Sequence, residues 1–213
     1  MDTDRLIRSL AADHEFRTRP LAAKLAPALL IALLVSLAML MATLGLRRDL
    51  MVAMRNPFFD LKFMVTLSLA LPAIAISLHL SRPEASLKGW AGWLLLPVLI
   101  LALAIPAEMM MLPQRPPMMT RLVGRSALLC LTAIPVLSLP LLAAALLVLR
   151  QGAPSRPALA GAVAGLLSAG LAGTIYAAHC IDDSPLFVAT WYTLATALVT
   201  AIGALAGAKW LKY

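Results

Sequence analysis

The chain has 213 residues, of which 62% are hydrophobic and only 13% charged, and its mean hydropathy is +0.89. Soluble globular domains carry about 25% charged residues, so an ordinary soluble domain is excluded. The net charge of +8 does not indicate binding to nucleic acid, because the lysines and arginines lie at the ends of apolar runs. The composition predicts an integral membrane protein in contact with the lipid bilayer, with no direct contact to nucleic acid.

Residues 1–24 form the only long polar segment. Thr3 could cap a short helix that would place Leu6, Ile7 and Leu10 on one face. An apolar stripe flanked by charge is typical of a helix that docks on a partner. We therefore predict a cytoplasmic partner-binding segment here, with a frayed tail carrying basic anchors as the alternative.

Six apolar runs follow, each about long enough to cross the hydrocarbon core of a bilayer as a helix. The predicted spans are 25–46, 63–80, 90–112, 126–149, 158–178 and 186–208. With the loops between them they form one transmembrane domain over residues 25–213, which leaves no room for a separate soluble domain. The predicted fold class is all-α: an integral membrane bundle of six transmembrane helices with a short cytoplasmic N-terminal helix.

The distribution of basic residues predicts the orientation of the bundle. If the loops alternate between the two sides, eleven lysines and arginines share the side of the N-terminus and seven lie opposite. Basic residues are enriched in cytoplasmic loops, so both termini are predicted to lie in the cytoplasm.

Two features concern packing. The segment Asn56-Pro57-Phe58-Phe59-Asp60 is predicted to lie along the membrane interface, with both phenylalanines at headgroup depth.

Small residues recur every fourth position on the fifth span, and two glycines repeat the pattern on the sixth. They are Gly161, Gly165, Ala169, Gly173, Ala177, Gly203 and Gly207. This pattern indicates close packing of those two helices or a dimer contact, and it leaves the oligomeric state open.

The loop within residues 176–192 is the only one between spans without lysine or arginine. It contains Cys180, and the only other cysteine is Cys130. The alternating topology places Cys130 about one turn inside the outer end of the fourth helix and Cys180 at the outer boundary. Both thiols are therefore predicted near the periplasmic face, in a compartment that permits disulfide formation.

The side chains around Cys180 could support such a pair. His179 supplies an imidazole, and thiolate with imidazole suits zinc-like or softer ions. Cys130, Cys180 and His179 are therefore a candidate metal-responsive or redox-responsive set, although their spacing matches no known zinc pattern. The alternative is that both cysteines are buried small hydrophobic residues. We expect no resident cofactor and at most transient binding of a heavy metal.

Asp182 and Asp183 have two interpretations. They could support the thiols, or the run Asp182-Asp183-Ser184-Pro185 could cap the last helix with the proline in its first turn.

The chain shows no enzyme motif. A nucleotide-binding loop, H-E-x-x-H and G-x-S-x-G are all missing from the sequence, and Glu108 is the only acidic residue within a predicted span. We therefore predict a protein that is not an enzyme. The alternatives are a small-solute or metal transporter, a membrane thiol oxidoreductase, for which C-x-x-C is missing, and a structural assembly factor.

Several motifs resemble those of the NrsF family of membrane anti-sigma factors, the negative regulators of sigma F. They are the Leu10–Asp13 segment, the run from Leu149 to Pro154 with Pro157, and His179-Cys180 followed by Asp182–Pro185, Phe187, Trp191 and Tyr192. The resemblance implies a sensor in the bacterial inner membrane that holds an extracytoplasmic-function sigma factor inactive. It also implies that metal or oxidative stress, sensed by Cys130 and Cys180, releases the sigma factor.

Overall fold

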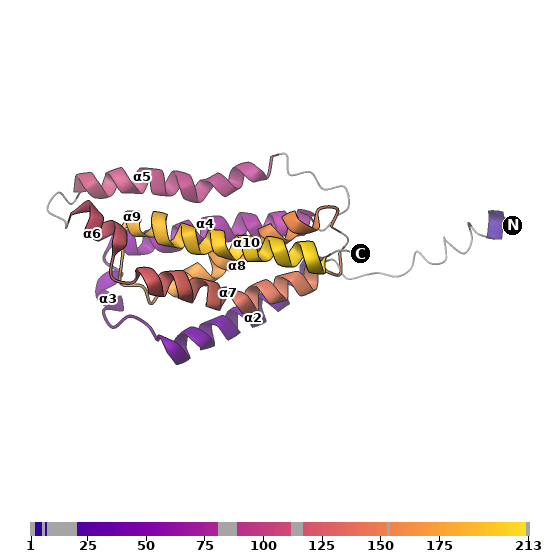
Figure 1. Ribbon diagram of the computed structural model, residues 1–213, viewed down its shortest axis with the longest axis horizontal. Helices are drawn as coiled ribbons and strands as arrows, with labels where there is room; N and C mark the ends of the chain where they lie inside the picture. The colour runs from indigo at the N-terminus through magenta and orange to yellow at the C-terminus, as the bar shows by residue number, and fades with distance from the viewer. Residues whose placement is uncertain are drawn as a thin grey trace.

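A computed structural model describes residues 3–5, 7, 21–80, 89–111, 117–152 and 154–211. All regular elements in these ranges are helical, so the predicted all-α class is confirmed (Figure 1). The long helices are α2 (Leu21–Thr43), α4 (Pro57–Leu80), α5 (Leu96–Met111), α7 (Ala127–Leu149), α8 (Pro157–Ala177) and α10 (Thr193–Trp210). Short elements are α3 (Leu50–Ala53), the 3₁₀ turn η2 (Ala91–Leu95), α6 (Met118–Val123), α9 (Pro185–Phe187) and the π-helical turn η3 (Val188–Tyr192).

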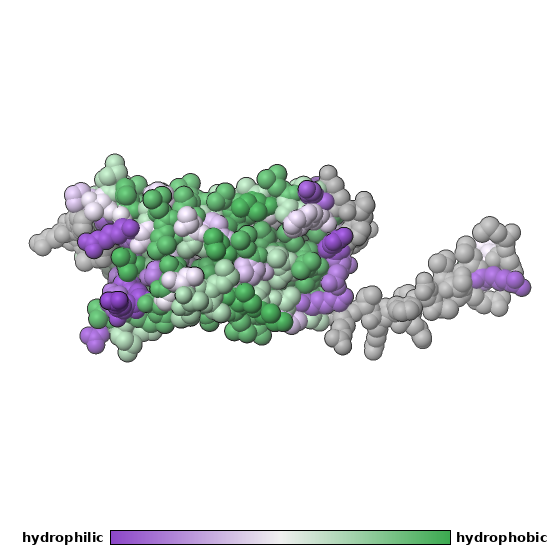
Figure 2. Space-filling model, turned by 60° about the horizontal axis from the view of Figure 1, so that its bottom comes forward, coloured by the Kyte–Doolittle hydropathy of each residue, from purple (hydrophilic) through white to green (hydrophobic). Residues whose placement is uncertain are grey.

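The described helices form six segments that are long and apolar enough to cross a membrane. On the face shown in Figure 2, hydrophobic residues cover the middle of the bundle and hydrophilic residues gather at its two ends. This is the pattern expected of a protein whose apolar surface faces lipid, because polar groups are expensive in the hydrocarbon core.

Helix α8 lies at the centre of the bundle. It packs against α10, α4 and α7, while α2 packs against α7 and α5 lies on the α4 side. A Cβ added to Gly161 would lie 2.2 Å from the carbonyl oxygen of Gly203, and one added to Gly165 would lie 2.7 Å from the Cα of Thr200. The glycines therefore let α8 and α10 approach closely, which confirms the predicted packing of these helices and requires no dimer.

The second spanning helix begins earlier than predicted. Asn56 Oδ1 accepts a hydrogen bond from the backbone N–H of Phe58 at 3.1 Å, and Pro57 occupies the first position of α4. Phe58 and Phe59 are buried inside the bundle rather than exposed at its surface, and their depth in a membrane stays a prediction. The earlier start also places Lys62 within the helix.

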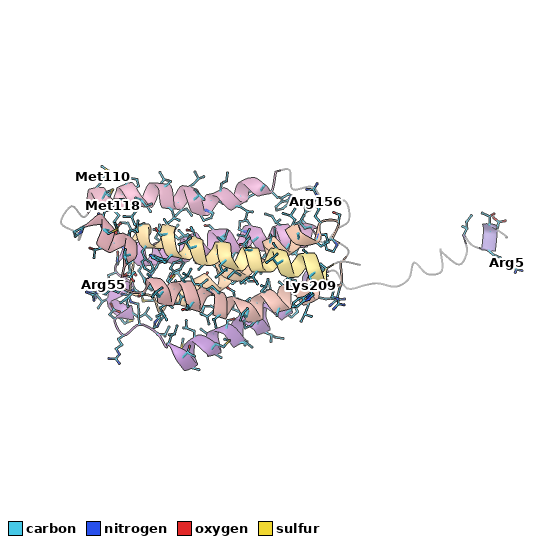
Figure 3. The ribbon with its side chains drawn as sticks, viewed as in Figure 1. Arg5, Arg55, Met110, Met118, Arg156 and Lys209 are labelled. Carbon is cyan, nitrogen blue, oxygen red and sulfur yellow. The ribbon has the colours of Figure 1, made fainter. Side chains whose placement is uncertain are left out.

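The two ends of the bundle carry different loops. Figure 3 shows Arg55, Met110 and Met118 at one end and Arg156 and Lys209 at the other. We call the first of these the thiol end. It comprises the loops of residues 44–56, 117–126 and 178–184 with the helix turns that adjoin them.

The predicted docking segment is described only in part. Thr3–Arg5 and Ile7 are helical, and the Ile7 side chain is exposed. Leu6 and Leu10 lie outside the described residues, so the predicted stripe stays a prediction.

Candidate functional site

Both cysteines lie at the thiol end, as the alternating topology predicted. Cys180 follows the end of α8, where its backbone N–H donates to the carbonyl of Tyr176 at 3.0 Å. Cys130 lies in the first turn of α7, with its N–H donating to the carbonyl of Ser126 at 2.7 Å. Both thiols are free and fully buried. They belong to the same cluster of buried residues, so the fold brings together two residues that are far apart in the sequence.

Asp182 connects the Cys180 loop to the helix that carries Cys130. Its carboxylate accepts hydrogen bonds from the backbone N–H groups of Ser126 at 2.8 Å and Arg125 at 3.1 Å. Those groups precede α7, where a helix leaves N–H groups without partners inside the helix. Asp182 therefore caps α7 from another loop and sets the position of Cys180 relative to Cys130.

The expectation that the Asp-Asp-Ser-Pro run caps the last helix is correct only for the proline. Pro185 takes the first position of α9, but Ser184 makes no side-chain capping bond. Instead, Ser184 Oγ donates to Glu108 Oε2 at 3.0 Å, because Glu108 of α5 is fully buried beside it. The polar side chains of this loop thus contact other helices rather than their own.

Asp183 and the carbonyl of Cys180 are held by the same two cations. Lys62 Nζ lies 2.7 Å from Asp183 Oδ1 and donates to the Cys180 carbonyl at 2.8 Å. Arg47 Nη1 lies 2.9 Å from the same carboxylate oxygen and 3.2 Å from the same carbonyl. Lys62 has no exposed surface, and a buried ammonium is tolerated only with such partners. The loop is therefore fixed to α4 and to the segment after α2.

A second carboxylate balances this pair of cations. Arg47 Nε and Nη2 each bond Asp49 at 2.8 Å, which raises the pKa of Arg47 and lowers the pKa of Asp49 to about 2. The Phe59 ring lies under both cations, 5.4 Å from Arg47 Cζ and 5.1 Å from Lys62 Nζ. The cluster has two positive and two negative groups, with Asp49 facing solvent.

His179 does not complete a preformed metal site. Its Nδ1 pairs with the carbonyl of Gly45 at 2.9 Å, and its ring lies 5.9 Å from that of Tyr176. In the described part of the chain, no three histidine, cysteine or acidic side chains are grouped to hold a metal ion. Metal binding by Cys130, Cys180 and His179 therefore stays a prediction that requires a rearrangement or a two-thiolate geometry.

Two tyrosines lie next to the buried thiols. Tyr176 and Tyr192 lie with ring centroids 6.0 Å apart, and both interact electrostatically with Cys180. Their hydroxyl groups are buried next to Cys180 and have no nitrogen or oxygen partner in the described residues. Burial raises the pKa of Cys180, and the positive charge of Lys62 opposes that effect. Burial therefore favours the neutral thiol of Cys180 and shields it from solvent.

The family described as NrsF, negative regulator of sigma F, matches residues 10–213. The chain belongs to the NrsF family. It is 37% identical over 219 residues to the anti-sigma-F factor NrsF of Caulobacter vibrioides (strain NA1000 / CB15N), covering 99% of both chains. It is 33% identical over 175 residues, 82% of each chain, to the probable anti-sigma-F factor NrsF of Azospira oryzae (strain ATCC BAA-33 / DSM 13638 / PS). No solved structure matches.

Sequence reasoning missed the cations of this NrsF-family site. Arg47 and Lys62 entered only as signs of orientation, yet both hold the Cys180 loop. A usable signal was present, because Asn56-Pro57 is a helix start and places Lys62 more than one turn inside an apolar helix. Tyr176 and Tyr192 carried no comparable signal, since aromatic residues at the ends of spans are common.

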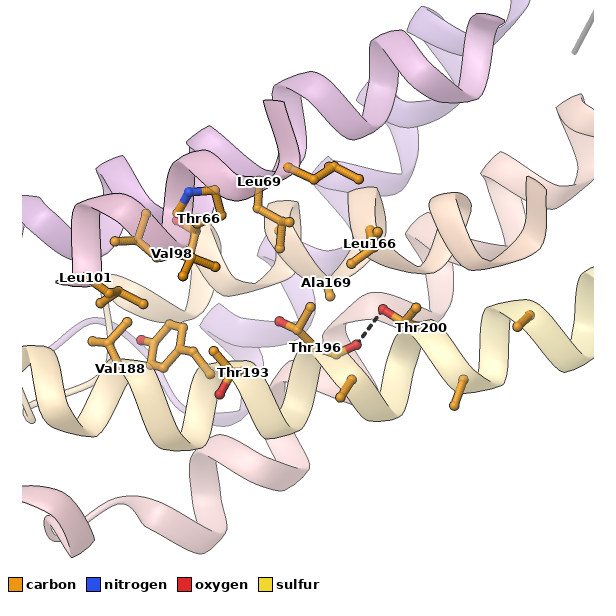
Figure 4. Close-up of a pocket in the computed structure, with 18 residues that line it drawn as sticks. Thr66, Leu69, Val98, Leu101, Leu166, Ala169, Val188, Thr193, Thr196 and Thr200 are labelled. Atoms are coloured by element: carbon orange, nitrogen blue, oxygen red, sulfur yellow. Dashed lines mark hydrogen bonds between the residues drawn. The ribbon is translucent and has the colours of Figure 1, made fainter. Parts of the chain in front are cut away.

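The NrsF-family bundle also contains a cavity of about 490 Å³ within its apolar band, between α5 and the α8–α10 pair (Figure 4). Its walls are aliphatic, apart from Tyr192 and four threonines. The hydroxyls of Thr66, Thr193 and Thr200 each donate to a carbonyl of their own helix. Neither cysteine lines the cavity, so it is separate from the thiols.

Proposed function

We propose that this chain is an anti-sigma factor of the bacterial inner membrane. It holds an extracytoplasmic-function sigma factor at the cytoplasmic face and releases it when a metal or an oxidant acts on Cys130 and Cys180. The near full-length similarity to a protein named an anti-sigma-F factor carries the sigma-factor part of the proposal. The burial of both free cysteines at one end of the bundle supports the sensing part.

The proposed signal begins at the thiols. Oxidation would join the two Sγ atoms, with two electrons passing to the oxidant and two protons released. Capture of a soft cation would release thiol protons instead. Either event changes the packing around Tyr176 and Tyr192, whose buried hydroxyls lie next to Cys180. The π-helical turn η3 ends at Tyr192, and such turns are frequent at functional sites.

The bundle offers a direct mechanical route to the opposite end. Cys130 is part of α7, and α7 packs on α8, which packs along α10. A shift at the thiol end would therefore move helix ends near Arg156 and Lys209. A hundredfold loss of affinity for the sigma factor needs only about 2.7 kcal/mol of coupling, which is the size of one strained contact.

Capture of the sigma factor is tested by co-purification. The tagged full-length chain and a variant lacking residues 2–14 are extracted from membranes of cells that express the sigma factor. We expect the full-length chain to retain it and the deletion to lose it, because the predicted stripe of Leu6, Ile7 and Leu10 is removed. Absence of the sigma factor from the full-length sample contradicts the proposal, and full retention by the deletion moves the docking site elsewhere.

Orientation needs a test that does not use the native cysteines, because both are buried. In a Cys130→Ser, Cys180→Ser background, a cysteine replaces either Arg55 at the thiol end or Arg156 at the other end. We expect a membrane-impermeant maleimide to label the first in intact spheroplasts and the second only after permeabilisation. The reverse pattern would place the thiol end in the cytoplasm.

A further inference from the structure

A polar cavity of about 360 Å³ lies at the thiol end, separate from the buried thiols. It is lined by Asn56, residues 120–121 and 124–125, and residues 181–184 of the loop after Cys180. The volume is many times that of one water molecule, about 30 Å³. The cavity therefore has room for a small polar group in contact with the Cys180 loop.

The two acidic residues of the cavity are already neutralised. Asp183 is paired with Lys62 and Arg47, and Asn56 Nδ2 lies 3.5 Å from its second oxygen. Asp182 accepts the backbone N–H groups at the start of α7. Neither carboxylate needs a further cation, so the cavity is not built to hold a positive ion.

The guanidinium groups of the two arginines of the cavity have fewer hydrogen-bond and ion-pair partners than these carboxylates. Nε and Nη1 of Arg121 are buried and make no hydrogen bond in the described residues. The partner of Arg121 is Glu108, 3.5 Å from Nη1, beyond good hydrogen-bond distance. Arg125 is exposed, and its side chain forms no ion pair with the residues that the structure describes. Both arginines thus line the cavity, and Arg121 carries two guanidinium nitrogens without an acceptor in the described residues.

We propose that this cavity binds a phosphate group through Arg121 and Arg125. A guanidinium matches the geometry of phosphate with two parallel N–H···O bonds, and charged hydrogen bonds of this kind are about twice as strong as neutral ones. Buried donors without acceptors cost free energy, which a phosphate oxygen would recover. The hydroxyl of Thr120 and the amide of Asn56 offer further polar contacts in the same cavity.

The phosphate group has two sources at this position. The cavity is lined by residues at or beside the ends of the candidate spans, so a phospholipid headgroup can reach it, as can free phosphate in the adjoining solution. In either case the bound group would contact residues 181–184, so its presence would stabilise the loop that holds Cys180. This inference is independent of the proposed sigma factor and of thiol chemistry.

The test uses the purified full-length protein in detergent. One arm measures binding of radiolabelled inorganic phosphate by equilibrium dialysis after delipidation. The other arm uses native mass spectrometry to count phosphatidylglycerol molecules retained when that lipid is added. We expect one of the two ligands to bind, with affinity reduced about tenfold or more by Arg121→Gln or Arg125→Gln, since each removes a charged contact. Arg55→Gln is the matched control, an exposed arginine at the same end that does not line the cavity, and it should bind normally.

Loss of Arg121 leaves Glu108 without this ion pair and could unfold the protein. Arg125→Gln avoids that problem because its side chain is exposed, and Glu108→Gln with Arg121→Gln removes both partners together. Binding of neither ligand, or equal binding by Arg55→Gln and Arg125→Gln, overturns the inference. If Arg125→Gln weakens only the binding of phosphatidylglycerol, the site belongs to a lipid headgroup. If it weakens only the binding of inorganic phosphate, the site belongs to free phosphate.

Discussion

At the scale of single residues, the site depends on a loop whose polar groups are all used by distant partners. Asp182 caps α7, Asp183 pairs with Lys62 and Arg47, and Ser184 bonds Glu108. These contacts place Cys180 in a fixed, dry position without any direct bond to the thiol from a charged side chain. The loop therefore links α7, α4, α5 and the segment after α2, and it also carries a thiol.

The two carboxylates that pair with Arg47 should differ in their contribution to stability. Asp183→Asn removes the charge between a fully buried lysine and a nearly buried arginine, so we expect a loss of about 3 kcal/mol. Asp49→Asn is the matched control, because its side chain is 55% exposed and screened by water, and its effect should be much smaller. Unfolding in SDS, followed by circular dichroism, measures both. Equal losses would contradict the role given to Asp183.

At the scale of elements, glycines decide which helices approach one another and where the loops turn. The α8–α10 contact was predictable from its four-residue repeat, because spacing alone identifies a small-residue face. The partners of Asp182, Asp183 and Lys62 were not predictable, because they lie more than fifty residues away in the sequence. The start of α4 was misplaced because Lys62 was read as a loop residue rather than as a buried cation.

Gly161 tests the close packing of α8 on α10. An added methyl group would lie 2.2 Å from the carbonyl oxygen of Gly203, so Gly161→Ala should lower stability by about 1–3 kcal/mol. Gly92→Ala is the control, since nothing lies within 4 Å of its added Cβ, and a change below about 0.5 kcal/mol is expected. The same SDS unfolding measures both, and an unaffected Gly161→Ala protein would show that these helices do not approach so closely.

Gly124 tests the link between α6 and the Cys180 loop. It has a φ of +60°, and an added Cβ would lie 2.5 Å from Phe187 and 2.8 Å from Asp182. Gly124→Ala should therefore displace the loop and speed alkylation of Cys180 several-fold in a Cys130→Ser background. Gly89→Ala shares the positive φ, has no neighbour within 4 Å and lies away from the thiol end, so it isolates the backbone cost of about 1–2 kcal/mol. An equal effect of both substitutions on alkylation would rule out the proposed contact.

At the scale of the whole molecule, the two ends of the bundle carry different groups and are separated by the length of its helices. The thiols, the buried charges and the polar cavity lie at one end, and Arg156 and Lys209 lie at the other. Composition and apolar runs were enough to predict the six-helix architecture and to place both cysteines at one end. The placement of the buried cations and tyrosines required three-dimensional contacts, which no periodicity in the sequence encodes.

The central claim is that Cys130 and Cys180 govern release of the sigma factor, and transcription from a sigma-dependent reporter tests it directly. Reporter activity is measured with and without diamide or a soft metal ion in cells with the native chain, Cys130→Ser or Cys180→Ser. Met110→Ala, exposed at the same end, is the control, and immunoblots confirm equal amounts in the membrane. We predict that the native chain and Met110→Ala respond, whereas either cysteine variant keeps the reporter repressed under stress. A full response in both cysteine variants would contradict the account.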